Sequence, residues 1–208
     1  MNVTKSFING VDFAAFVKHP AFITIATIIG IGAIFFICMQ IVFYIYKKRL
    51  NTPITDKEEI LSNSNTKNKI LILYHPSKHG TTKNTVDKIS KYYNENGYEI
   101  TINVASCKKA YATNLYKIIY LVSPVYFGKV SDFLKKFVQE NVIENQIVYI
   151  VNIGKLHYQP KEFENLASII SNTNEIHKLK LRGDEKDIKD AIENLSHWDK
   201  FFYMKYLL

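Results

Sequence analysis

The hydrophobic pattern of the chain begins with a long apolar run. From Ala21 to Tyr46 no residue is charged, and Gln40 is the only strongly polar one. About 20 apolar residues are enough to cross the hydrocarbon core of a bilayer as a helix. A cleaved signal peptide would have a shorter apolar region and a small-residue cleavage site, whereas this run ends in two tyrosines and Lys47-Lys48-Arg49. We therefore predict a retained transmembrane helix over 21–46, after an N-terminal lead over residues 1–20.

Basic residues flank this run unequally, which predicts its orientation. Lys5 and Lys18 precede the run, and four basic residues follow it by position 57. Positively charged flanks tend to stay in the cytoplasm. We expect a single-pass protein of the cell membrane whose C-terminal part is cytoplasmic.

After the span, a polar stretch gives way to alternating apolar runs and amphipathic segments. Residues 47–68 contain the basic stop, Pro53 and a run of Ser, Asn, Thr and Lys, so we predict a flexible linker there. Short apolar or alternating runs predict strands over 70–74, 98–104, 117–122, 147–151 and 176–181. Apolar positions at helical spacing predict helices over 82–96, 131–139, 160–170 and 184–195.

Strands that alternate with helices predict parallel βαβ units. The expected fold class is α/β over residues 69–196, with a five-stranded parallel doubly wound sheet in the order 2-1-3-4-5, preceded by one transmembrane helix. In such a sheet a ligand binds at the carboxyl ends of the first and third strands. Residues 197–208 form a separate aromatic and basic C-terminal segment.

The loop after the first strand, residues 75–85, is rich in hydroxyl groups and leads into a helix N-terminus. Unpaired backbone N–H groups and the helix dipole favour an anion there, and Gly80 lets the backbone close around it. We predict a site for a phosphate monoester. The loop has neither the spacing of a triphosphatase loop nor that of a dinucleotide fingerprint. The alternative is a simple helix cap made by Thr81 or Thr82.

Two further loops end on the same predicted edge. The second loop, Ser123 to Lys129, carries adjacent aromatic residues. The third loop, Asn152 to Tyr158, contains Gly154, and the side chain of His157 or Tyr158 is able to cover the ring of a ligand. A planar ligand is bound by aromatic side chains against its faces and by backbone N–H and C=O groups that form hydrogen bonds with its edge. The alternative for the second loop is that Tyr126 and Phe127 pack beneath the next helix. A phosphate site beside an aromatic slot matches the shape of FMN.

Charge and cysteine content narrow the function classes. Residues 47–208 carry 25 Lys/Arg and 18 Asp/Glu, which suits an anionic membrane surface or reflects composition alone. The basic residues follow no motif of a nucleic-acid reader, so no nucleic-acid partner is expected. Cys38 and Cys107 have no partner at metal-ligand or redox spacing, and no metal site is expected.

Residues 69–195 resemble the flavodoxin-like family. The family's phosphate loop reads [ST]-x-T-G-x-T, which this chain matches at Ser77, Gly80 and Thr82 and departs from at His79. The segment from Ser123 to Gly128 is similar to the family's flavin-ring pattern S-P-x-Y-[FW]-G. The resemblance implies FMN as cofactor and no catalytic side chain. Together, the three loops and the resemblance predict the cofactor-binding residues Ser77, Lys78, His79, Gly80, Thr81, Thr82, Ser123, Pro124, Val125, Tyr126, Phe127, Gly128, Asn152, Gly154 and Tyr158.

Three functions follow from this resemblance. The first is electron transfer between bound FMN and a redox partner protein or quinone at the membrane. The second is a quinone-linked oxidoreductase of protoporphyrinogen-oxidase type, whose membrane-docking region the segment from Trp198 to Leu208 resembles, although the chain lacks that group's long insertion near the fifth strand. The third is a cofactor-free, membrane-tethered interaction module. If FMN binds, Lys78, Lys83, Lys129 and Lys155 are expected to raise its potential above that of acidic flavodoxins.

Overall fold

A computed structural model describes residues 20–52, 54–62, 68–106, 109–155, 158–184 and 186–194. Its contacts divide the chain into two compact units, residues 1–46 and 47–208. Residues 1–19 of the expected lead over 1–20, and the C-terminal segment over 197–208, lie outside the described residues.

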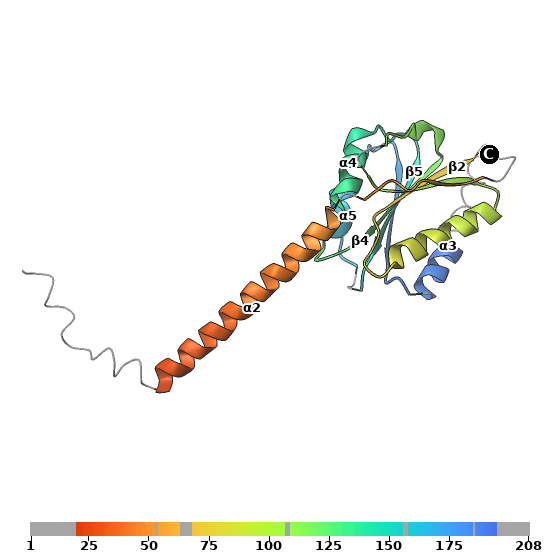
Figure 1. Cartoon of the computed structure of the whole chain (residues 1–208). Coiled ribbons are helices and arrows are strands. Elements are labelled where there is room, and N and C mark those ends of the chain that lie inside the picture. The colour runs from red at the N-terminus through yellow and green to blue at the C-terminus, as the bar shows by residue number, and fades with distance from the viewer. Residues whose placement is uncertain are drawn as a thin grey trace, which may run out of the picture. The chain divides into compact units, whose positions relative to one another are not determined.

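The first unit contains most of a single long helix, α2, from Pro20 to Leu50 (Figure 1). The predicted span over 21–46 lies inside this helix. Its 31 residues rise by about 46 Å at 1.5 Å per residue. Its apolar side chains are exposed almost throughout. By length and composition, α2 is able to cross a membrane.

The second unit is built on one six-stranded sheet. Its strands are β1 (Glu59–Leu61), β2 (Lys69–Tyr74), β3 (Glu99–Val104), β4 (Ile118–Pro124), β5 (Ile147–Ile153) and β6 (Glu175–Leu181). They lie in the order β1-β3-β2-β4-β5-β6. The pairs β3–β2, β2–β4, β4–β5 and β5–β6 are parallel, and β1 pairs antiparallel with β3. Every residue of β4 and β5 is buried, as expected for central strands covered on both faces.

The edge strand β1 corrects two expectations, the flexible linker over 47–68 and the five-strand sheet order. Its three residues are all exposed, so no hydrophobic pattern marks them as a strand. Long-range contacts hold this stretch instead. The Lys57 N–H donates to Asn103 Oδ1 at 3.1 Å, and Asp56 accepts a hydrogen bond from Ser106. The observed order differs from the predicted order because β1 is added beside β3.

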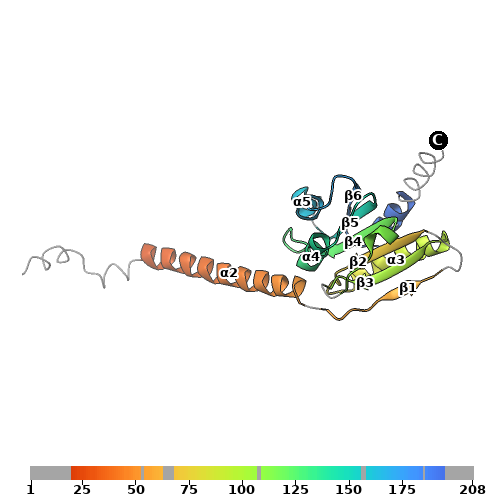
Figure 2. The same cartoon turned by 90° about the horizontal axis from the view of Figure 1, so that it is seen from above.

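Helices cover both faces of the sheet. One face carries α3 (Thr81–Glu95) and the helical residues 186–194, and the other carries α4 (Asp132–Glu140) and α5 (Lys161–Ala167), as Figures 1 and 2 show. A short 3-10 turn, η1 (Thr113–Leu115), precedes β4. Two apolar clusters fill the layers. One contains Val86, Ile89 and Tyr93 of α3, and the other contains Leu134, Phe137 and Phe163.

Asn103 links the segment before β1 to β3 and to Tyr111, and its loss is expected to destabilise the domain. Its Oδ1 accepts from the backbone N–H groups of Lys57 and Val104, and its Nδ2 donates to Tyr111 Oη at 2.7 Å. Asn103→Ala should lower the free energy of unfolding by about 1–3 kcal/mol, because the buried Val104 N–H and the partly buried Lys57 N–H lose their acceptor. Urea unfolding followed by circular dichroism measures this. The exposed Asn114→Ala is the control, and equal stability of both variants would contradict the assignment.

Candidate functional site

The carboxyl ends of β2, β4 and β5 lie side by side, so the three predicted loops leave the same edge of the sheet. In the parallel register Tyr74 pairs with Val122, and Val122 pairs with Val151. The His75 N–H donates to the Val122 carbonyl at 2.9 Å. The Val125 N–H donates to the carbonyl of Ile153 at 2.8 Å. From β2 the chain crosses outward to β3 and then returns to β4 on the other side, which is the switch point where doubly wound sheets bind ligands.

The first loop folds into a compact turn that ends at the N-terminus of α3. Gly80 is the N-cap with φ of +72°, a left-handed conformation that favours glycine. The cap therefore has no side chain, so the alternative of Thr81 or Thr82 as the cap is wrong. Ser77 precedes α3 and forms hydrogen bonds with its first turn: its Oγ accepts from the Thr82 N–H at 3.1 Å and lies 2.8 Å from Thr81 Oγ1.

This turn presents donors that suit an anion. The Thr82 Oγ1 is buried and has no hydrogen-bond partner among the described residues. A buried hydroxyl without a partner is uncommon and marks a place where a ligand can supply one. A Cβ placed on Gly80 would meet nothing within 4 Å, so the turn has open space beside it. Lys78 and His79 are both exposed. The donor set and the space fit a phosphate group.

Lys83 is held elsewhere, which corrects its expected place around the cofactor. Its Nζ lies 2.7 Å from Asp87 Oδ1 and 3.1 Å from Glu59 Oε2. Partial burial lowers the pKa of Lys83, but the hydrogen bonds to Asp87 and Glu59 together outweigh burial and raise it. Lys83 thus joins α3 to the edge strand β1.

The second loop divides into a buried and an exposed half. Ser123 and Pro124 belong to β4 and are fully buried. Ser123 Oγ donates to the Pro124 carbonyl at 2.9 Å and accepts from the Ser131 N–H at 3.1 Å. These two residues therefore shape the loop from below. Val125 is half-buried and follows them at the edge.

The exposed half is a tight turn from Tyr126 to Lys129, closed by backbone hydrogen bonds in both directions. Phe127 (φ +52°) and Gly128 (φ +71°) both have positive φ, as a type I′ turn requires. A positive φ is unfavourable for phenylalanine, and such strain is concentrated at functional sites. Phe127 is 48% exposed, so the alternative that it packs in the core is wrong. Tyr126 Oη accepts from the Lys78 N–H at 3.4 Å and joins the first two loops.

The third loop begins with buried Asn152 in β5 and continues to Gly154, whose N–H donates to the Leu181 carbonyl at 2.9 Å. A Cβ at Gly154 would lie 3.4 Å from the Val125 carbonyl oxygen, so the second and third loops approach closely there. Tyr158 is 52% exposed and stacks on Phe163 with ring centroids 5.2 Å apart. His157 lies outside the described residues.

His75 also lies at this edge of the sheet, although its sequence position does not mark it as part of the site. It is 1% exposed and directly precedes the phosphate turn. Its Nδ1 lies 3.2 Å from Ser131 Oγ, the N-cap of α4, and its ring stacks on Phe133. Burial lowers the pKa of His75, and a hydrogen bond to the Arg49 backbone opposes this in part. A single histidine after a strand has no pattern that predicts its burial.

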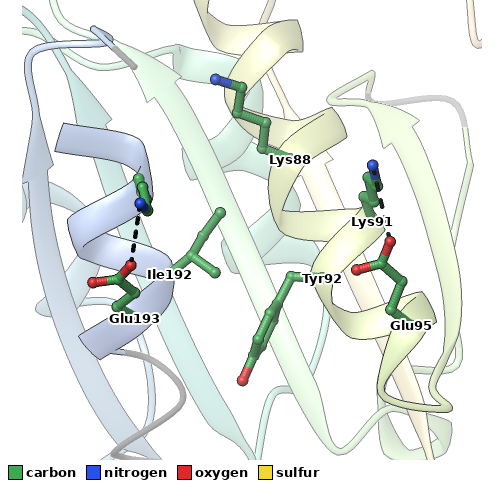
Figure 3. A pocket seen from close by; sticks show the side chains of 7 residues that line it. Lys88, Lys91, Tyr92, Glu95, Ile192 and Glu193 are labelled. Carbon is green, nitrogen blue, oxygen red and sulfur yellow. Dashed lines mark ion pairs between the residues drawn. The ribbon is translucent and has the colours of Figure 1, made fainter. Parts of the chain in front are cut away.

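A separate hollow of about 530 Å³ lies between α3 and the helical residues 186–194 (Figure 3). Tyr92 and Ile192 point into the gap, and its ion pairs, Lys91–Glu95 and Lys189–Glu193, each stay within one helix. It lies beside the C-terminal half of α3, whereas the loops converge at the N-terminal end of that helix. Among the described residues no group of three His, Cys, Asp or Glu is placed to hold a metal ion.

Comparisons with known proteins assign the family. The sequence model of the flavodoxin domain matches residues 71–187, which is more than half of the chain, so the chain belongs to this family. No curated protein matches it in sequence.

Among solved structures, a flavodoxin of Streptococcus pneumoniae TIGR4 is 15% identical to this chain with a TM-score of 0.49, and the aligned part covers 60% of this chain and 93% of the flavodoxin. Flavodoxin 2 of Bacillus cereus is 19% identical with a TM-score of 0.48 and covers 60% and 93%. A flavoprotein of Lactobacillus acidophilus, solved in complex with FMN, is 14% identical with a TM-score of 0.44 and covers 59% and 97%.

The buried His75 is expected to make stability depend on pH. Its pKa in the folded chain lies below the ordinary 6.5, so the unfolded chain binds the proton more readily. The contribution of neutral His75 to the free energy of unfolding is therefore complete above pH 6.5 and is lost as the pH falls through the pKa of the folded chain. The thermal midpoint should fall between about pH 8 and about pH 5, and His75→Gln should reduce this fall. The exposed His79→Gln is the control, and an unchanged pH dependence in His75→Gln would refute the prediction.

Proposed function

We propose that this chain is a membrane-anchored electron-transfer protein that binds FMN at the carboxyl edge of its sheet. One observation carries the proposal. The phosphate turn (residues 77–82) and the aromatic turn (residues 126–129) meet at the switch point of the sheet, and the Lys78–Tyr126 hydrogen bond joins them. Membership of the flavodoxin domain family supports a flavin cofactor.

The chain's own groups would hold FMN at two places. The phosphate would be bound by the first-turn N–H groups of α3 and by the hydroxyls of Ser77, Thr81 and Thr82. The ring would lie between the second and third loops, where Tyr126, Phe127 and Tyr158 offer aromatic surface at partly or largely exposed positions. Bound FMN supplies the redox chemistry, and the protein supplies position and electrostatics.

The proposal includes α2 as a membrane anchor that leaves the domain in the cytoplasm. Support comes from the length and apolar character of α2 and from the three basic residues in its last turn. An anchored domain is confined to partners at the membrane, so we propose that its electrons pass to or from a membrane redox protein or a quinone. The exposed Lys78, Lys129 and Lys155 add positive charge at the site edge, which favours reduced, anionic flavin.

The buried Thr82 hydroxyl gives a direct test of FMN binding. The full-length chain in detergent should quench FMN fluorescence on binding. Thr82→Val should raise the Kd by roughly 10- to 100-fold, because a hydrogen bond to a charged group is lost. Thr85→Val is the matched control: Thr85 is equally buried on the same helix, but its Oγ1 donates to the Thr81 carbonyl at 2.9 Å.

Riboflavin, which lacks the phosphate, separates the two halves of the site. Riboflavin should bind the wild-type chain more weakly than FMN does, and its Kd should not change with Thr82→Val. No binding of FMN to the wild-type chain would overturn the redox proposal and favour the cofactor-free interaction module.

The anchor is tested by extraction and by fusions at the C-terminus. The full chain should stay in the membrane pellet after alkaline carbonate washing, and a chain that lacks residues 1–46 should be released, because α2 is the only described helix able to span. A fluorescent protein at the C-terminus should be active and a secreted phosphatase inactive. Release of the full chain would exclude the anchor, and the reverse fusion pattern would exclude the cytoplasmic orientation.

A further inference from the structure

A largely buried ion pair lies beneath the third loop. Lys180 of β6 and Glu162 of α5 pair at 2.5 Å between Nζ and Oε2, with side chains 9% and 1% exposed. Asn152 of β5 is the register partner of Lys180 and is fully buried. Three polar side chains from three elements thus meet at the carboxyl edge of the sheet.

The hydrogen bonds of this cluster are incomplete. Asn152 Nδ2 donates to the Glu162 carbonyl at 3.2 Å, and Lys180 Nζ donates to Glu162 Oε2. Asn152 Oδ1 and Glu162 Oε1 are buried without a partner in the described part of the chain. A buried ion pair contributes little net stability compared with apolar residues of the same volume. Fold stability alone therefore does not account for a charged pair here.

The ammonium group is the end of this pair nearest the loops. A Cβ on Gly154 would lie 3.4 Å from Lys180 Nζ and 3.4 Å from the Val125 carbonyl oxygen. No atom of Glu162 is among the three nearest to that point. Gly154 has no side chain to separate the ammonium from the junction of the second and third loops. The pair therefore presents its positive end to the place where these loops meet.

We propose that Lys180 favours reduced over oxidised FMN through its buried positive charge, and that Glu162 positions this charge and limits its effect. The inference rests on the proposed function, which places the flavin ring between the second and third loops. Two electrons and one proton convert oxidised flavin into a reduced form with one more negative charge. A buried charge acts on that form with little screening, whereas the exposed lysines are screened by salt.

The test compares the Kd of oxidised FMN with that of FMN reduced by dithionite, which supplies the electrons, under anaerobic conditions. The full-length chain in detergent is used throughout. Lys180→Met combined with Glu162→Gln removes the charges together and avoids leaving a buried carboxylate unpaired. This double variant should lower the preference for reduced FMN by about threefold to tenfold. Lys178→Met, an exposed lysine two residues away on β6, is the matched control and should change nothing.

Glu162→Gln alone gives a result of opposite sign. It removes the countercharge and leaves the ammonium unopposed, so the preference for reduced FMN should rise. A role in packing alone would not reverse sign between these variants, and this single variant also carries the test if the double variant does not fold. Unchanged Kd ratios in folded variants of a chain that binds FMN would overturn the role of Lys180 alone. Absence of FMN binding to the wild-type chain would overturn this inference together with the proposed function.

Discussion

The parallel register of β2, β4 and β5 is the constraint on which the site depends. Parallel strands that share a register end at one edge, and here the crossing from β4 to β5 runs through α4 on one face of the sheet. The loops that follow these strands therefore converge whatever their own sequences are. The outward crossing to β3 and the return to β4 leave the crevice between β2 and β4 open. Local loop chemistry then decides what this crevice can hold.

A row of buried or largely buried polar residues joins the apolar core to that edge. Ser123, Asn152 and Lys180 are register neighbours near the carboxyl ends of β4, β5 and β6, and His75 directly follows β2; all four lie on the face that carries α4 and α5. Their partners, Ser131 and Glu162, lie at the starts of these two helices. At the start of α4 the Ser131 N–H is satisfied by Ser123 Oγ. At the start of α5 Asn152 Nδ2 and Lys180 Nζ donate to Glu162, so the row ties both helices to the edge. On the opposite face α3 begins at a glycine cap, and Ser77 Oγ of the preceding loop accepts from its Thr82 N–H.

The sequence was informative where many residues contribute to one signal. Runs such as 70–74 and 147–151 predicted buried strands, and the alternation with helices predicted that the loops converge. The strand β1 could not be foreseen, because its three exposed residues have no periodic pattern and their partners in β3, Ile100 to Ile102, lie some 40 residues later. Lys83 was misplaced for the same reason, since its partner Glu59 lies on that strand. The burial of His75 and of Lys180 was not predicted, because burial of a single polar residue is a property of the packed fold.

Neutral and charged groups are distributed in a way that separates binding from redox tuning. The phosphate turn offers N–H groups and hydroxyls, and Lys83, the nearest lysine of α3, is paired with Glu59 and Asp87. Affinity for a phosphate held by such neutral donors depends less on salt than affinity supplied by exposed lysines. The buried ammonium of Lys180 acts instead beside the loops that would hold the ring. Because burial protects this charge from screening, the potential of a bound flavin would persist across ionic conditions that weaken the surface field of the basic domain.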